Sequence, residues 1–211
     1  MVASMPVSGT ERTTTVIIGA GFSGLAVASE LSRRGVETIV VDGLDTPGVP
    51  SGPITGSLPR CDSAASAGLI ERTEILRHLR NYAASHHLDI RNATRASQLN
   101  LVDAVPGNAT PPQWEVHTAT GILLADTIVL TRCAQAQLRR MLAELGMALG
   151  QNMAAALRAI GIYLVGVGEL IVPSPKEVLR QAKTVSKAIS ATLRQQPGTS
   201  AAGLAALPAP A

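Results

Sequence analysis

Three glycines at a fixed spacing, Gly19, Gly21 and Gly24, have the clearest chemical meaning in this chain of 211 residues. A glycine has no Cβ, so its backbone can turn tightly and can lie close to a bound phosphate. The three follow an apolar run, Val16–Ile18, and precede a segment with helical spacing. The first turn of such a helix offers unpaired N–H groups and a partial positive charge. The pattern therefore predicts a pyrophosphate-binding turn between a strand and a helix.

An acidic residue, Asp42, follows the next apolar run at Thr38–Val41 and lies eighteen residues beyond Gly24. A dinucleotide-binding βαβ unit has a carboxylate at about this place, where it accepts hydrogen bonds from the ribose hydroxyls. Gly35 lies where the predicted helix should end. The order of strand, glycine turn, helix, strand and acid predicts an α/β fold with a parallel sheet. A βαβ unit that packs tightly and binds nothing is the alternative.

The composition narrows the classes of partner. Apolar residues make up 46% of the chain, which suits a folded core, but aromatic residues make up only 2%. Rings that stack on bases are therefore scarce, which argues against recognition of single-stranded nucleic acid. The net charge of +3 is modest and the basic residues are scattered along the chain. We expect no nucleic-acid partner.

The cysteines and histidines do not have the spacing of a metal or redox site. Cys61 and Cys133 are far apart, and the four histidines have no acidic partner at ligand spacing. We expect no metal, and few cysteines are typical of a reducing compartment. No signal peptide and no membrane-length apolar run are recognised in the sequence. We therefore expect a cytoplasmic protein with no membrane partner.

The rest of the chain divides into loops and regular elements. We expect residues 1–11 to be disordered, 12–195 to form one domain and 196–211 to be a disordered tail. The stretch 43–68 is rich in Gly, Pro and Ser, which predicts a long loop. Periodicity within the domain predicts a helix over 72–85, short strands at 89–91 and 99–102, an antiparallel β-meander over about 98–130, a helix over 134–158, a strand at 162–165 and a helix over 175–193.

Four further blocks, in order, carry a resemblance to a known family: Glu71–Ala83, Leu88–Ala96, Trp114–Leu130 and Gly161–Gly166. With the glycine turn, they resemble the FAD-binding portion of the two-dinucleotide-binding-domain flavoproteins, and most of all the flavin-containing monooxygenase branch. The resemblance implies a Rossmann-like FAD-binding domain with a central parallel sheet and an inserted antiparallel β-meander. It favours FAD over NAD, because a domain that binds only NAD has no reason to return to the cofactor after the meander.

The resemblance also implies the residues that contact the cofactor. The glycine turn would hold the pyrophosphate, Asp42 the ribose, and the backbone near Ala96 the adenine. The chain after two later strands would pass close to the diphosphate and the ribityl group. The cofactor-binding residues expected in this way are Gly19, Ala20, Gly21, Phe22, Ser23, Gly24, Asp42, Gly43, Ala96, Thr131, Arg132, Gly166, Val167 and Gly168.

The sequence departs from the family at three places. The family's Ala-Thr-Gly is Thr131-Arg132-Cys133 here, which removes a glycine and adds an arginine that could pair with phosphate. No second glycine fingerprint is present to hold NADPH, because Gly166-Val167-Gly168 lacks a third glycine and Pro173 follows. The loop 43–68 lacks the Gly-Gly-x-Trp segment that covers the flavin in relatives. The chain therefore resembles a shortened member without an NADPH-binding unit.

Two functions remain open at this point. The first is an FAD-dependent, monooxygenase-like oxidoreductase, in which a complete member takes hydride from NADPH and inserts oxygen into a small substrate. The second is a shortened, catalytically impaired FAD- or nucleotide-binding protein. The resemblance favours an enzyme, with a second copy or a partner chain left to supply a nicotinamide site. No catalytic residue is assigned; His117, Glu169 and Arg132 are candidates by position only.

The spacing of the tyrosines argues against a short-chain dehydrogenase. That family needs a tyrosine with a lysine four positions later. Tyr82 and Tyr163 are followed at that position by His86 and Val167.

Overall fold

The computed structural model describes residues 9–44, 63–102, 113–131, 153–166 and 173–195. Five of its strands form a parallel sheet in the order β3-β2-β1-β5-β6. Their bounds are β1 Gly9–Ile18, β2 Thr38–Leu44, β3 Asp89–Val102, β5 Gly121–Leu130 and β6 Ile162–Leu164. The apolar ends of β1 and β5 are buried on both faces, as parallel strands in a covered sheet require. The predicted α/β fold with a central parallel sheet is confirmed.

The antiparallel meander is also present. β4, Gln113–Thr118, pairs antiparallel with both β3 and β5, so it joins the far end of β3 to the start of β5. The two short strands predicted at 89–91 and 99–102 are wrong, because β3 runs through both without a break. A register shift between Ala96 and Gln98 lets this strand leave β2 and continue against β4.

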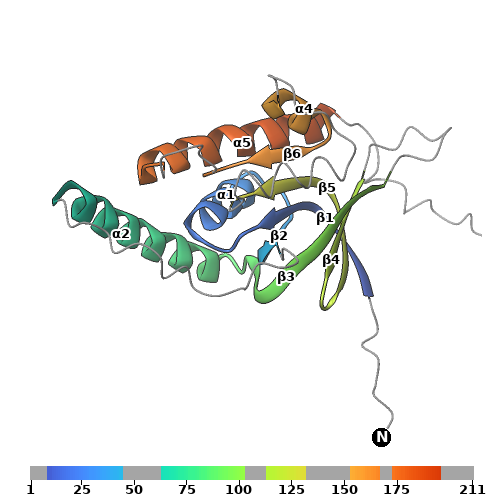
Figure 1. Ribbon diagram of the computed structural model, residues 1–211, viewed down its shortest axis with the longest axis horizontal. Coiled ribbons are helices and arrows are strands. Elements are labelled where there is room, and N and C mark those ends of the chain that lie inside the picture. Colours follow the sequence, from blue (N-terminus) through green and yellow to red (C-terminus); the bar gives the residue numbers. More distant parts are fainter. Residues whose placement is uncertain (1–8, 45–62, 103–112, 132–152, 167–172, 196–211) are drawn as a thin grey trace, which may run out of the picture.

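Three helices cover one face of the sheet, and the meander lies on the other face together with a further helix (Figure 1). On one face, α1 (Phe22–Ser32) lies between α2 (Ser63–Ser85) and α5 (Pro175–Gln195). Their core side chains pack on Ile17, Val40 and Val129. On the other face, the meander and α4 (Met153–Ala159) pack on the alternate strand residues, which include Val16 and Ile18. The alternation of side chains along β1 thus divides the core into two layers.

Several predicted boundaries are corrected. β1 begins at Gly9, so residues 9–11, expected to be disordered, pair with the start of β5. Gly43 belongs to β2, and α2 begins at Ser63, so both ends of the predicted loop 43–68 belong to regular elements. Three predicted features lie outside the described residues: the remainder of that loop, most of the helix predicted over 134–158, and the segments 1–8 and 196–211 that we expected to be disordered.

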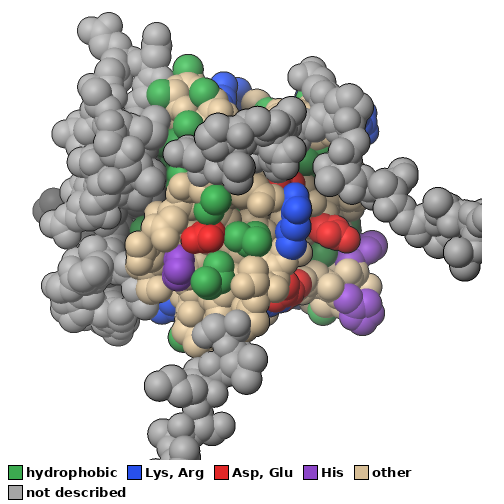
Figure 2. Space-filling model, turned by 90° about the vertical axis from the view of Figure 1, so that its right-hand side faces the viewer, with side chains coloured by type: hydrophobic (Ala, Val, Ile, Leu, Met, Phe, Trp, Pro, Cys, Tyr) green, Lys and Arg blue, Asp and Glu red, His purple; other side chains and the backbone are tan. Residues whose placement is uncertain are grey.

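The described surface is mixed in character. Figure 2 shows the face at the right of Figure 1, where acidic, basic and hydrophobic side chains of the described residues are interspersed rather than gathered by kind. Within the described ranges, no helix is both long and apolar enough to cross a membrane.

Candidate functional site

The glycine turn is fixed to the neighbouring strand by backbone hydrogen bonds. The Gly19 N–H donates to the Val41 carbonyl oxygen at 2.8 Å, and the Ala20 N–H donates to the Asp42 carbonyl oxygen at 3.3 Å. Gly19 has φ of +119°, a conformation that residues with a side chain rarely adopt. The end of β1, the turn and the end of β2 therefore form one rigid unit.

The first turn of α1 has positive character that no side chain of the described residues caps. Gly21 is the N-cap residue with φ −81° and ψ −166°, no described side chain caps the helix, and the first turn contains no acidic residue. The N–H groups of the first turn of a helix have no partner within the helix. This end of α1 is thus suited to an anion.

Gly24 allows α1 to pack directly on the turn. A Cβ at this position would overlap the Gly19 carbonyl oxygen, and it would also lie 3.6 Å from Cγ2 of Ile17. Only a residue without a side chain therefore lets the start of α1 lie this close to the end of β1.

Two later segments return to the same turn. Thr131, which follows β5, directs its hydroxyl at the carbonyl oxygens of Ile18 and Gly19, at 3.0 and 3.2 Å. Gly166, which follows β6, has φ of +70°, and a Cβ there would overlap the Ser23 hydroxyl. The segments that follow β1, β5 and β6 therefore meet at the N-terminus of α1. They lie at the carboxyl edge of the sheet, where open α/β sheets bind ligands.

A cavity of about 370 Å³ opens at this meeting point. The residues that line it include Gly21, Ser23, Thr131, Gly166, Val178 and Arg72. Its walls combine helix N–H groups, hydroxyls and one arginine, and its volume falls in the range of small-molecule sites. An anionic ligand matches this set of donors.

The residues predicted to bind the adenosine half lie on the adjoining edge of the sheet. Asp42 is exposed at the end of β2, and no described residue forms an ion pair with it. Ala96 of β3 is opposite Leu44, two residues beyond Asp42. A Cβ on Gly43 would lie 3.6 Å from the Arg95 guanidinium. The structure thus brings Asp42, Gly43 and Ala96 to one edge, while their contacts with a cofactor stay a prediction.

Other predicted residues fall elsewhere. Arg132, Val167, Gly168 and Glu169 lie outside the described residues. His117 is on β4, where its Nε2 atom is 3.2 Å from Nδ2 of Asn100, and it does not line the cavity. Among the described residues, no group of three potential ligands could hold a metal ion.

Two polar residues at the site, Arg72 and Gln181, were not predicted as site residues from the sequence. Arg72 comes from α2, and Gln181 of α5 accepts a hydrogen bond from the Gly166 N–H at 3.0 Å. Both are polar residues within ordinary amphipathic helices, and only the packing of α2 and α5 on α1 brings them to the turn. Sequence spacing contains no signal for such contacts between separate elements.

Gln181 is held in place by Glu177. Hydrogen bonds from Arg180, and then from Gln181, lower the pKa of Glu177 to about 2. Since the pKa of Glu177 is lower in the folded chain, its ionised carboxylate stabilises the fold fully above the ordinary pKa of 4.5. This stabilisation is lost as the pH falls toward 2.

We expect the urea midpoint of the wild type to fall more steeply between pH 5 and pH 2 than that of Glu177→Gln. Equal pH profiles would contradict the assignment, and the effect should be small because this pair faces solvent.

Comparison with known proteins agrees with this geometry. Residues 17–67 match a model of the NAD(P)-binding Rossmann-like domain. No curated protein matches the sequence. Among solved structures, the chain is similar to THI4 from Thermovibrio ammonificans, with 16% identity, a TM-score of 0.56, and 87% of this chain and 91% of that chain covered.

Two further solved structures are similar to a lesser degree. A variant of the flavin monooxygenase from Stenotrophomonas maltophilia has 12% identity and a TM-score of 0.49, with 87% of this chain and 99% of that chain covered. A thioredoxin reductase from Gloeobacter violaceus has 22% identity and a TM-score of 0.37 over 59% of this chain. The chain spans 35% of the length of that reductase. The chain is therefore an α/β protein with a Rossmann-like fold. Its residues 17–67 match the model of the NAD(P)-binding Rossmann-like domain, and its fold is similar to that of THI4 over most of its length.

Proposed function

We propose that this chain binds FAD in an extended pose and serves as the FAD-binding domain of a monooxygenase-like oxidoreductase. The observation that supports it most is the return of the chain after β5 and β6 to the glycine turn, where Thr131 braces the turn and Gly166 packs on Ser23. A domain that binds its ligand only through the first βαβ unit does not need these two returning segments.

The residues at the turn fit the diphosphate of a dinucleotide. Gly21 presents no side chain, the α1 N-terminus is uncapped by described residues, and the adjoining cavity has room for phosphate groups. The first-turn N–H groups would hold the phosphates, and Asp42 would accept hydrogen bonds from the ribose hydroxyls. When bound, FAD would supply the electron-transfer chemistry, while the protein binds and orients it.

The substrate of this protein would be a small molecule. NADPH, if used, would bind on a second copy or a partner chain. The isolated cysteines suit a reducing, cytoplasmic setting. A shortened, catalytically impaired nucleotide-binding protein is the second candidate, favoured by the single glycine fingerprint in the sequence.

The visible absorption spectrum of the purified protein tests the proposal, followed by anaerobic addition of NADPH. A bound-flavin spectrum that bleaches supports an active oxidoreductase. Bound flavin that does not bleach favours the second candidate. No bound flavin, even after incubation with excess FAD, would reject FAD as the ligand.

Replacing Asp42 by alanine should weaken FAD binding by about 1–3 kcal/mol, because hydrogen bonds between the ribose hydroxyls and a carboxylate are lost. The dissociation constant is measured by the change in flavin fluorescence on titration. Glu37→Ala is the matched control, since Glu37 is an exposed acid just before the other end of β2. Equal dissociation constants for Asp42→Ala and the wild type would reject the ribose role.

A further inference from the structure

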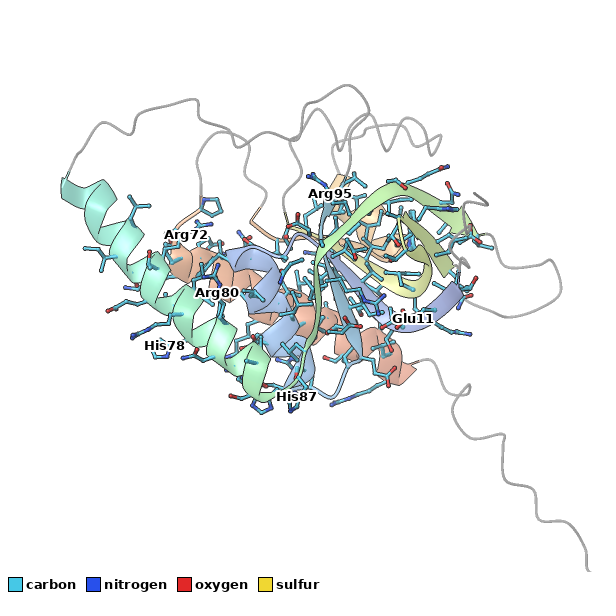
Figure 3. All side chains as sticks on the ribbon, turned by 90° about the horizontal axis from the view of Figure 1, so that it is seen from below. Glu11, Arg72, His78, Arg80, His87 and Arg95 are labelled. Carbon is cyan, nitrogen blue, oxygen red and sulfur yellow. The ribbon has the colours of Figure 1, made fainter. Side chains whose placement is uncertain are left out.

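Arg72 places a cation beside the N-terminus of α1. Its guanidinium carbon lies 5.0 Å from the centroid of the Phe22 ring, and Phe22 is the first residue of α1. Figure 3 shows Arg72 on the side of α2 that faces α1 and α5. The ring is buried, with 3% of its surface exposed, so it is a fixed platform for the guanidinium.

The charge of Arg72 has no carboxylate partner among the described residues. By contrast, Arg91 pairs with Glu11 and Asp89, and Arg180 pairs with Glu177. The residue before Arg72, Glu71, pairs instead with Lys176 of α5, at 3.7 Å. The Arg72 guanidinium and the positive end of α1 thus face the same cavity, where a bound anion would relieve their mutual repulsion.

We propose that Arg72 binds a phosphate group of the dinucleotide while its guanidinium stacks on Phe22. This inference rests on the proposed function and adds a residue to that site. The planar guanidinium packs one face on the ring and leaves its N–H edges free to bond phosphate oxygens, which a lysine could do only as a point charge. Arg72 thereby makes the site selective for a ligand with a diphosphate over an uncharged analogue such as riboflavin.

The test is a titration with FAD at low and high salt, for the wild type and for Arg72→Met, Arg72→Lys and Arg80→Met. Arg80 is an exposed arginine two turns further along α2, which makes it a control for net charge and helix content (Figure 3). We expect the dissociation constant for FAD to rise about 10- to 100-fold in Arg72→Met, with a weaker salt dependence. Arg72→Lys should recover part of the affinity, and Arg80→Met should match the wild type.

The outcomes separate this inference from the proposed function. If the wild type binds FAD and Arg72→Met binds it equally well, the role of Arg72 is wrong and the function stands. Equal losses in Arg72→Met and Arg80→Met would also overturn it, since net charge alone would then explain the effect. If the wild type binds no FAD, both proposals fall. Circular dichroism checks folding, and Arg72→Gln replaces the methionine variant if that variant unfolds.

Discussion

Replacing Gly21 by valine is expected to abolish FAD binding while leaving the chain folded. Gly21 lines the cavity at the start of α1. Its backbone, with φ −81° and ψ −166°, is extended and accepts any residue without strain. The added branch would occupy the space that the phosphate oxygens need, so affinity should fall at least about 100-fold. Valine is a poorer N-cap than glycine, which should cost about 1 kcal/mol of stability.

Gly9→Val is the matched control for this variant. A Cβ on Gly9 meets nothing within 4 Å, and Gly9 lies at the opposite end of β1 from the turn. Flavin fluorescence titrations measure affinity, and urea unfolding measures stability for both variants. A folded Gly21→Val protein that retains FAD like the wild type would rule out the glycine turn as the diphosphate site.

The region from Val16 to Asp42 was predictable because its signals are local. Each glycine acts through its own backbone or through a contact within the βαβ unit, as the close packing of Gly24 on Gly19 shows. Apolar runs with no alternation indicate strands buried on both faces, and these runs form the buried parts of β1 and β2. Chemistry encoded within one unit can therefore be inferred from one sequence.

The start of β1 and the middle of β3 were not predictable for the opposite reason. Residues 9–12 are polar and exposed, and they are held as a strand only by pairing with the start of β5. The middle of β3 is also polar and resembles a loop, but it pairs first with β2 and then with β4. These segments are strands because they pair with strands far away in the sequence. An alternation of apolar and polar residues, the usual sign of a strand, is therefore not needed and is absent from them.

The same distinction applies to the site. Gly19, Gly21 and Gly24 could be inferred as a group, and the structure places them at the meeting point of three strand ends. Arg72 could not be inferred, because its place beside Phe22 depends on the packing of α2 on α1. The roles of Arg132 and Val167 stay predictions, because both residues lie outside the described ranges.

Replacing Gly24 by alanine should destabilise the packing of α1 on the glycine turn, and not only weaken FAD binding. In an ordinary helix interior this change stabilises a protein by about 0.5–1 kcal/mol. Here the new methyl group would overlap the Gly19 carbonyl oxygen, which is backbone and cannot rotate away. Gly19 is also held by its hydrogen bond to Val41 and by the Thr131 hydroxyl, so α1 must move away from the sheet.

We therefore expect Gly24→Ala to lower the free energy of unfolding by about 1–3 kcal/mol or more, the range for an overfilled core, and to lose FAD binding with it. Urea unfolding of the wild type, Gly24→Ala and the control Gly9→Ala measures the effect.

The sign of the change in unfolding free energy distinguishes two roles of Gly24. If Gly24 were an ordinary helix residue with no contact to the turn, the alanine variant would be more stable than the wild type. Stabilisation would mean that α1 does not contact the turn as described. A loss of stability shared by Gly9→Ala would point to a general effect of added methyl groups. Destabilisation of Gly24→Ala alone would establish that the third glycine keeps the helix against the strand, and so keeps the helix N-terminus at the phosphate site.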